Sequence, residues 1–182
     1  KQIDREKKTQ RKSRQGTFKV ALVGYTNVGK SSLMNKLTGA NTLVENKLFA
    51  TLDSTVRKVK KNFPYPVLLS DTVGLINKLP HDLVASFKST LDEVRDADLL
   101  IHVVDISHPE YKNQMQTTDD LLIQMEMDAI DVVLVFNKTD SIEDIEELDR
   151  AQQNFPSAIS ISCKKGEGID ALRQKIVTQY EK

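Results

Sequence analysis

The stretch "FKVALVGYTNVGKSS", residues 18–32, places a short apolar run directly before two glycines and a lysine. Residues Phe18–Val23 are apolar and rich in β-formers, and the run stops at Gly24 as a buried strand would. The pattern G-x-x-x-x-G-K-[ST] is matched by Gly24, Gly29, Lys30 and Ser31. A helical spacing of apolar residues follows. The stretch therefore predicts a phosphate-binding loop between a strand and a helix.

The two glycines would let the backbone of this loop curl so that successive N–H groups face phosphate oxygens, with the positive end of the helix dipole behind them. We expect Lys30 to reach the β- and γ-phosphates and the Ser31 hydroxyl to bind Mg²⁺. A plain glycine turn with an exposed lysine is the alternative. The predicted nucleotide contacts of this segment are Gly24, Tyr25, Thr26, Asn27, Val28, Gly29, Lys30, Ser31 and Ser32.

The nucleobase is indicated by a second motif, "NKTD", which follows an apolar run directly. The Asp140 carboxylate can accept two hydrogen bonds from the ring N–H and the amino group of guanine, a donor pair that adenine lacks. We expect Asn137 to tie this loop to the phosphate loop and the stem of Lys138 to cover the base. The motif predicts GTP and GDP as ligands, through Asn137, Lys138, Thr139 and Asp140.

Two further loops complete the predicted site. In "DTVG" (Asp71, Thr72, Val73 and Gly74), Asp71 is placed to hold Mg²⁺ through water and the Gly74 N–H to meet the γ-phosphate. Loss of that contact on hydrolysis would release the following segment, as in GTPase switches. "SCKKGEG" (residues 162–168) places the backbone of Ser162, Cys163 and Lys164 near the guanine carbonyl. We expect Cys163 to pack rather than react, since no activating base is evident.

Apolar runs alternate with helical patterns along the rest of the chain. The predicted strands are Phe18–Val23, Val56–Phe63, Pro66–Asp71, Asp98–Asp105, Asp131–Phe136 and Ser157–Ser162. The predicted helices are Ser31–Leu37, Leu83–Val94, Gln114–Met127, Ile142–Gln152 and Ile169–Tyr180. Only Val56–Phe63 alternates with charged residues, which favours an edge strand. The pattern predicts a three-layer α/β domain with a mostly parallel six-stranded sheet, one antiparallel edge strand and ligands at the carboxyl ends of its strands.

Bulk composition favours one globular domain. The chain has 182 residues, 39% apolar and 29% charged, and no apolar run approaches the ~20 residues that span a bilayer. A single cysteine and the lack of a signal-peptide pattern favour the cytoplasm. Residues 1–16 are strongly basic and are expected to be a helical or disordered segment, either solvated or in contact with RNA phosphates. Residues 17–182 are expected to form the G domain.

A resemblance to a known family extends this interpretation. "ALVGYTNVGKSSLMNKLTGA", "LFATLD", "DTVGLINKLPHDLVASFKSTLDEVRDADLLIHVVD" and "VFNKTD" resemble the GTPase domain of HflX proteins, within the Era, Obg and MnmE group of P-loop, Ras-like G domains. "LFATLD" and "LPHDLV" are specific to HflX, whereas the phosphate loop is common to all P-loop proteins. The chain departs mildly from the family at Val28, Ser32 and "DSTVR" (Asp53–Arg57).

The resemblance implies further site residues and a partner. Thr51 would be the switch threonine that contacts Mg²⁺, and the nucleotide would be bordered by Phe49, Ala50, Thr51, Leu52 and Asp53. HflX proteins also carry an N-terminal domain and a helical hairpin, of which the basic segment resembles the last piece, so a longer parent protein is expected. The family binds the large ribosomal subunit and splits stalled ribosomes, which implies that partner here. We expect a monomer without membrane contact.

Slow hydrolysis is expected because Gly74 is followed by Leu75 and Ile76 rather than by a water-orienting glutamine. In the related MnmE type, an asparagine at the position of Asn27 helps to hold K⁺ against the phosphates. Asn27 is therefore a candidate K⁺ ligand, or else it only shapes the turn. Lys30, Thr51, Gly74 and Asn27 are the predicted catalytic residues.

Two histidines and three other function classes offer alternatives to this interpretation. His102 is expected to be a core residue, and His81 a residue of a helix start rather than a catalytic base. The alternatives to a GTPase switch are a GTP-gated binding module with negligible hydrolysis, a GTPase in RNA processing and a small-molecule kinase. The kinase is disfavoured because a small-molecule kinase would need neither the guanine-recognition motif "NKTD" nor the switch-like segment "FATLD".

Overall fold

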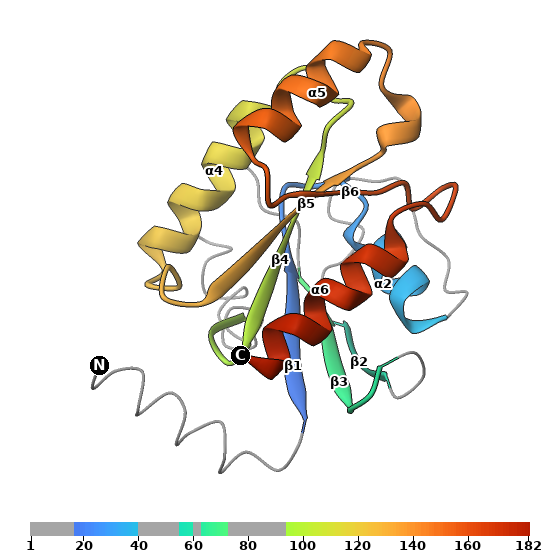
Figure 1. Cartoon of the computed structure of the whole chain (residues 1–182). Coiled ribbons are helices and arrows are strands. Elements are labelled where there is room, and N and C mark those ends of the chain that lie inside the picture. The colour runs from blue at the N-terminus through green and yellow to red at the C-terminus, as the bar shows by residue number, and fades with distance from the viewer. Residues whose placement is uncertain (1–16, 40–54, 60–62, 73–93) are drawn as a thin grey trace.

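The computed structural model describes residues 17–39, 55–59, 63–72 and 94–182 (Figure 1). The basic segment and most of the predicted helix Leu83–Val94 lie outside these residues. The elements are β1 (Phe18–Val23), α2 (Lys30–Thr38), β2 (Thr55–Val59), β3 (Val67–Asp71), β4 (Leu99–Asp105), α4 (Tyr111–Gln124), β5 (Asp131–Asn137), the 3-10 turn η1 (Thr139–Ser141), α5 (Ile145–Asn154), β6 (Ile159–Ser160) and α6 (Ile169–Glu181).

The strands of the described chain form a six-stranded sheet in the order β2-β3-β1-β4-β5-β6. Strand β2 runs antiparallel to β3 at one edge, and the pairs β1–β3, β1–β4, β4–β5 and β5–β6 are parallel. Every residue of the central strand β4 is buried, as its continuous apolar sequence requires when helices cover both faces. The predicted α/β fold with one antiparallel edge strand is confirmed.

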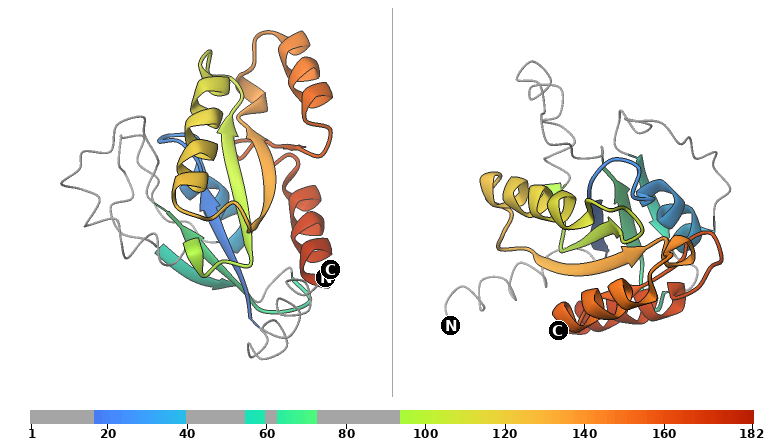
Figure 2. Two further views of the ribbon diagram at one scale, coloured as in Figure 1. Left: turned by 90° about the vertical axis from the view of Figure 1, so that its left-hand side faces the viewer. Right: turned by 90° about the horizontal axis from the view of Figure 1, so that it is seen from above.

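Helices cover both faces of the sheet, which gives three layers (Figure 2). On one face, α2 and α6 pack against alternate residues of β1, with Leu22, Leu33 and Leu172 fully buried in one cluster. On the other face, α4 and α5 pack over β4 and β5 through Tyr111, Phe136 and Ala151, among others. Each fully buried Leu or Phe stabilises the fold by about 1.5–3 kcal/mol relative to an exposed one.

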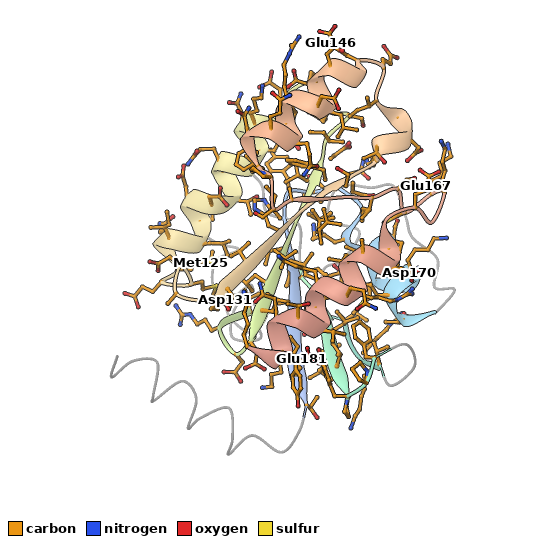
Figure 3. The ribbon with its side chains drawn as sticks, in the orientation of Figure 1. Met125, Asp131, Glu146, Glu167, Asp170 and Glu181 are labelled. Atoms are coloured by element: carbon orange, nitrogen blue, oxygen red, sulfur yellow. The ribbon has the colours of Figure 1, made fainter. Side chains whose placement is uncertain are left out.

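Polar side chains lie on the outside of the helical layers. Glu146 of α5 and the residues Asp170 and Glu181 of α6 are exposed (Figure 3). In the ranges that the structure describes, no helix combines the length and the apolar character needed to cross a membrane.

Local capping explains where two helices differ from their predicted bounds. Helix α5 begins at Ile145 rather than Ile142 because the Asp144 carboxylate caps it, accepting a hydrogen bond from the Glu146 N–H at 3.0 Å. Helix α4 ends at Gln124 because Glu126 adopts a left-handed conformation (φ 59°), and the Met127 N–H then bonds back to the Leu122 carbonyl at 2.9 Å. Non-glycine terminators of this kind give little sequence signal.

Candidate nucleotide-binding site

The carboxyl ends of the parallel strands meet at one edge of the sheet, and the predicted motifs gather there. The phosphate loop follows β1, Asp71 ends β3 and Asp105 ends β4. Asn137 ends β5, directly opposite Asp105 in the strand register. This is the edge at which open α/β sheets bind ligands.

Glycine is required at both ends of the phosphate loop. Gly24 has φ 147°, and a Cβ there would lie 2.3 Å from the Val103 carbonyl oxygen of the neighbouring strand. Gly29 has φ 98°, and a Cβ there would lie 2.3 Å from Nδ2 of Asn137. The phosphate loop thus runs against β4 and against Asn137 without room for a side chain at either glycine. Asn137 is the first residue of the "NKTD" segment, residues 137–140, which we call the base loop. Gly29 also starts α2, since its carbonyl accepts the Leu33 N–H at 2.9 Å.

The residues between the glycines differ in exposure. Thr26 and Val28 are buried, Tyr25 packs partly buried against the core, and Asn27 is exposed with a left-handed backbone (φ 62°). Ser32, in the first turn of α2, is half-buried. The loop is therefore anchored through its apolar side chains, while Asn27 stays at the surface.

Lys30 is buried with its ammonium group inside the loop. Nζ donates hydrogen bonds to the carbonyl oxygens of Gly24 at 3.2 Å and Tyr25 at 2.8 Å. Burial lowers the pKa of Lys30 to about 8, against the opposing effect of the nearby Asp71 carboxylate. A phosphate group beside this ammonium would favour its charged form.

Ser31 and Asp71 bring hydroxyl and carboxylate oxygens together. Ser31 Oγ donates to Asp71 Oδ2 at 2.5 Å, and Thr72 Oγ1 fixes the start of the next loop by donating to the Leu22 carbonyl at 2.6 Å. Mg²⁺ prefers hard oxygen ligands of this kind and completes its shell with water and phosphate oxygens. The described residues hold no cluster of three or more His, Cys, Asp or Glu that could bind a metal.

Asn137 joins the base loop, the phosphate loop and the loop after β6, which we call the last loop. Its Nδ2 donates to the Val28 carbonyl at 2.8 Å, and its Oδ1 accepts the Cys163 N–H at 3.2 Å. Asn137 is 1% exposed, so both groups would cost about 1–3 kcal/mol each if left unpaired. One buried amide therefore sets the spacing between the two ends of the site.

Asp140 is oriented by the last loop. Ser162 Oγ donates to Asp140 Oδ1 at 2.6 Å, and this bond holds the pKa of the carboxyl below its ordinary value. Thr139 fixes the same turn by donating through Oγ1 to the Ile161 carbonyl at 3.0 Å. The result is a carboxylate kept ionised and aimed by a neighbouring hydroxyl, as an acceptor for two N–H donors must be.

Two further residues of the loop after β6 directly follow Ser162, a buried cysteine and an exposed lysine. Cys163 is buried, and burial raises the pKa of its thiol to about 12, so the thiol is a packing group and not a nucleophile at neutral pH. Lys164 is exposed beside it.

Several predicted site residues lie outside the described residues. These are Phe49, Ala50, Thr51, Leu52, Asp53, Val73, Gly74 and His81. His102 is 2% exposed on β4, with Nδ1 3.2 Å from Asp119 Oδ1, while its buried Nε2 has no hydrogen-bond partner among the residues that the structure describes. It lies within the core, on the face covered by α4.

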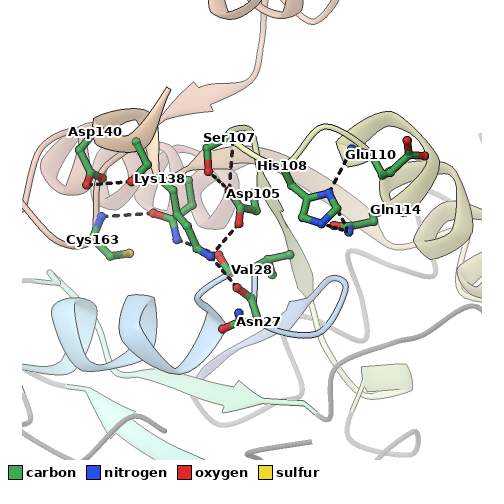
Figure 4. A network of polar contacts seen from close by, with 12 residues as sticks. Asn27, Val28, Asp105, Ser107, His108, Glu110, Gln114, Lys138, Asp140 and Cys163 are labelled. Atoms are coloured by element: carbon green, nitrogen blue, oxygen red, sulfur yellow. Dashed lines mark hydrogen bonds and ion pairs between the residues drawn. The ribbon is translucent and has the colours of Figure 1, made fainter. Parts of the chain in front are cut away.

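Sequence reasoning missed one residue of the site, Asp105. Its carboxylate lies 2.7 Å from Nζ of Lys138 and accepts hydrogen bonds from Ser107 (Figure 4). An acidic residue that ends a fully buried strand at the ligand edge was the available signal.

Comparisons with known proteins indicate the family to which the chain belongs. A family model described as "50S ribosome-binding GTPase" matches residues 19–138. The chain is 55% identical to GTPase HflX of Flavobacterium psychrophilum, over 96% of this chain and 47% of that protein. It is 40% identical to GTPase HflX of Escherichia coli, over 96% of this chain and 42% of that protein. The chain thus spans less than half the length of these relatives.

A solved structure shares the fold. A GTP-binding protein of Sulfolobus solfataricus in complex with GDP superposes with a TM-score of 0.70 at 27% identity, over 90% of this chain and 52% of that one. The chain belongs to the family of 50S ribosome-binding GTPases, as a G domain of the HflX type.

Proposed function

We propose that this chain is a Mg²⁺-dependent GTP-binding and GTP-hydrolysing switch domain whose nucleotide state controls attachment to the large ribosomal subunit. The observation that carries the proposal is the Asn137 amide, which holds the base loop and the phosphate loop at a fixed spacing. A nucleotide that spans both loops must fit that spacing, with guanine at Asp140 and phosphates at Lys30.

Each residue of the site has a task in this mechanism. The loop N–H groups and Lys30 would hold the β- and γ-phosphates and offset the charge that spreads over the γ-phosphate oxygens during transfer. Ser31 would bind Mg²⁺ directly and Asp71 through water, and the ion when bound neutralises phosphate charge. Asp140 would accept two hydrogen bonds from guanine, with Lys138 beside the base. Thr51 would contact Mg²⁺, and the Gly74 N–H would contact the γ-phosphate.

Intrinsic hydrolysis should be slow, because neither Leu75 nor Ile76 can orient the attacking water after Gly74. Faster turnover then requires a partner that positions the water or adds positive charge. The family description and the names of the relatives support the large ribosomal subunit as that partner. The basic segment, residues 1–16, is a further candidate contact with rRNA phosphates.

The decisive experiment is the single-turnover rate of GTP hydrolysis in potassium buffer, with and without purified large ribosomal subunits. We expect stimulation of about tenfold or more by large subunits, since completing a phosphoryl-transfer site has effects of this size or larger. Small ribosomal subunits serve as the control for unspecific contact with RNA. Equal rates in all three conditions would refute ribosomal activation of this domain, and failure to bind guanine nucleotides would refute the whole proposal.

A GTP-gated binding module with negligible hydrolysis is the second candidate, and the missing glutamine favours it. The same assay separates the two. If large subunits bind the GTP form tightly but GTP remains intact over many hours, the chain is a binding module rather than an enzyme.

Asn27 offers a test of how positive charge reaches the phosphates. We propose that it helps to hold K⁺ there, because it is exposed at the bend of the loop. An arginine finger is worth about 10³ to 10⁵ in rate, and a monovalent cation should give less, about ten- to hundredfold. We therefore expect faster hydrolysis in potassium than in sodium buffer, and loss of that difference in Asn27→Ala. The matched control is Asn154→Ala, at the exposed end of α5. Equal wild-type rates in both buffers would reject the K⁺ site.

A further inference from the structure

The ammonium group of Lys138 joins two loops of the site to the end of β4. Its Nζ donates to the Asn27 carbonyl at 2.8 Å and lies 2.7 Å from Asp105 Oδ2 (Figure 4). Lys138 belongs to the loop after β5, Asn27 to the loop after β1, and Asp105 ends β4. This contact fixes the base loop to the phosphate loop at a second point, beside the Asn137 amide.

Asp105 is built into the fold as an acceptor. Its side chain is 11% exposed, compared with 31% for that of Lys138. The carboxylate oxygen that does not face Lys138 accepts two hydrogen bonds from Ser107, from Oγ at 2.6 Å and from the backbone N–H at 3.1 Å. Those bonds fix the direction of the carboxylate independently of Lys138. Its position is thus set by its own strand and turn.

The backbone at both ends of the Lys138–Asn27 contact is of a kind that needs support. Lys138 (φ 64°) and Asn27 (φ 62°) are both left-handed, a conformation that residues other than glycine adopt rarely. Such conformations persist where surrounding contacts determine them. The hydrogen bond from Nζ to the Asn27 carbonyl supplies one of those contacts, and the Asp105 carboxylate holds Nζ in place.

We propose that Asp105 is a positioning residue for guanine-nucleotide binding, which acts by fixing the Lys138 side chain between the base loop and the phosphate loop. The inference rests on the proposed function, since it concerns the same site. Asparagine would serve less well than Asp105, because it lacks the negative charge that faces Lys138 and its NH2 group would meet either the Lys138 ammonium or the Ser107 N–H, which both only donate.

A double-mutant cycle tests the proposal, with the dissociation constant of GDP as readout. We expect Asp105→Asn to weaken binding by about ten- to hundredfold, the range expected for one hydrogen bond to a charged group. Lys138→Met keeps the apolar stem but removes the ammonium and should also weaken binding. If Asp105 acts through Lys138, the double variant binds GDP no more weakly than Lys138→Met alone. Weakening by the product of the two single effects would overturn the proposal.

Two further variants serve as controls for the double-mutant cycle. Asp128→Asn, at an exposed position after α4, is the matched control and should leave the affinity unchanged. Ser107→Ala removes one of the two hydrogen bonds that direct Asp105 and should weaken binding modestly, but only while Lys138 is present. This variant tests the proposal even if Asp105→Asn fails to fold. A Ser107→Ala effect that persists in Lys138→Met would overturn it, whereas a wild-type chain that binds no guanine nucleotide would refute the proposed function itself.

Discussion

Replacing Lys30 by methionine should lower the single-turnover rate of GTP hydrolysis by roughly 10² to 10³-fold, the usual cost of removing one donor aimed at developing charge. Lys30 is 6% exposed, and its ammonium donates hydrogen bonds to the carbonyl oxygens of Gly24 and Tyr25 in the phosphate loop. The measurement is hydrolysis in the presence of large ribosomal subunits, where we expect the rate to be highest.

The unfolding temperature distinguishes a variant that has lost only the ammonium group from one that has lost its fold. Methionine matches the length of the lysine stem, and burial already disfavours the charged form of Lys30, so Lys30→Met should unfold at the same temperature as the wild type or at a higher one. The control is Lys58→Met, at an exposed position of the edge strand β2. A folded Lys30→Met variant that hydrolyses GTP at the wild-type rate would show that Lys30 does not contact the transferred phosphate.

Short sequence motifs predicted the local geometry of the phosphate loop and the character of the edge strand. Gly24 and Gly29 were expected to allow a tight loop, and the structure shows why no side chain fits there, since a Cβ at either position would lie 2.3 Å from a neighbouring atom. The single antiparallel edge strand also followed from a local pattern, because charge alternation distinguishes an edge strand from buried ones. The signal in these cases is local.

The contact between Lys138 and Asp105 could not be predicted in the same way. It depends on the register of β4 against β5, which places Asp105 opposite Asn137 and so within reach of the next residue. Periodicity shows that both segments are strands but not how they are aligned. The end of α4 at Gln124 was not predicted either, because Glu126 terminates the helix in a left-handed conformation and the sequence has no glycine there to indicate it.

Base recognition should change most with Asp140→Asn, which we expect to weaken GDP binding by about 10² to 10⁴-fold. The wild-type carboxylate can accept from both the ring N–H and the amino group of guanine, whereas asparagine keeps one acceptor and turns a donor toward the amino group. Xanthine carries a carbonyl oxygen in place of that amino group. The variant should therefore prefer xanthosine diphosphate to GDP, which reverses the wild-type order. Competition binding of the two nucleotides measures this directly.

The reversal of preference, rather than the loss of affinity, is what identifies Asp140 as the base-reading residue. Ser162 can still donate to the remaining oxygen of an asparagine, so the loop should keep its shape. Asp149→Asn, at an exposed position of α5, is the matched control and should leave both affinities unchanged. If Asp140→Asn weakened GDP and xanthosine diphosphate equally, Asp140 would support the loop without contacting the base. Guanine selectivity would then have to come from the backbone after β6, where Cys163 and Lys164 lie.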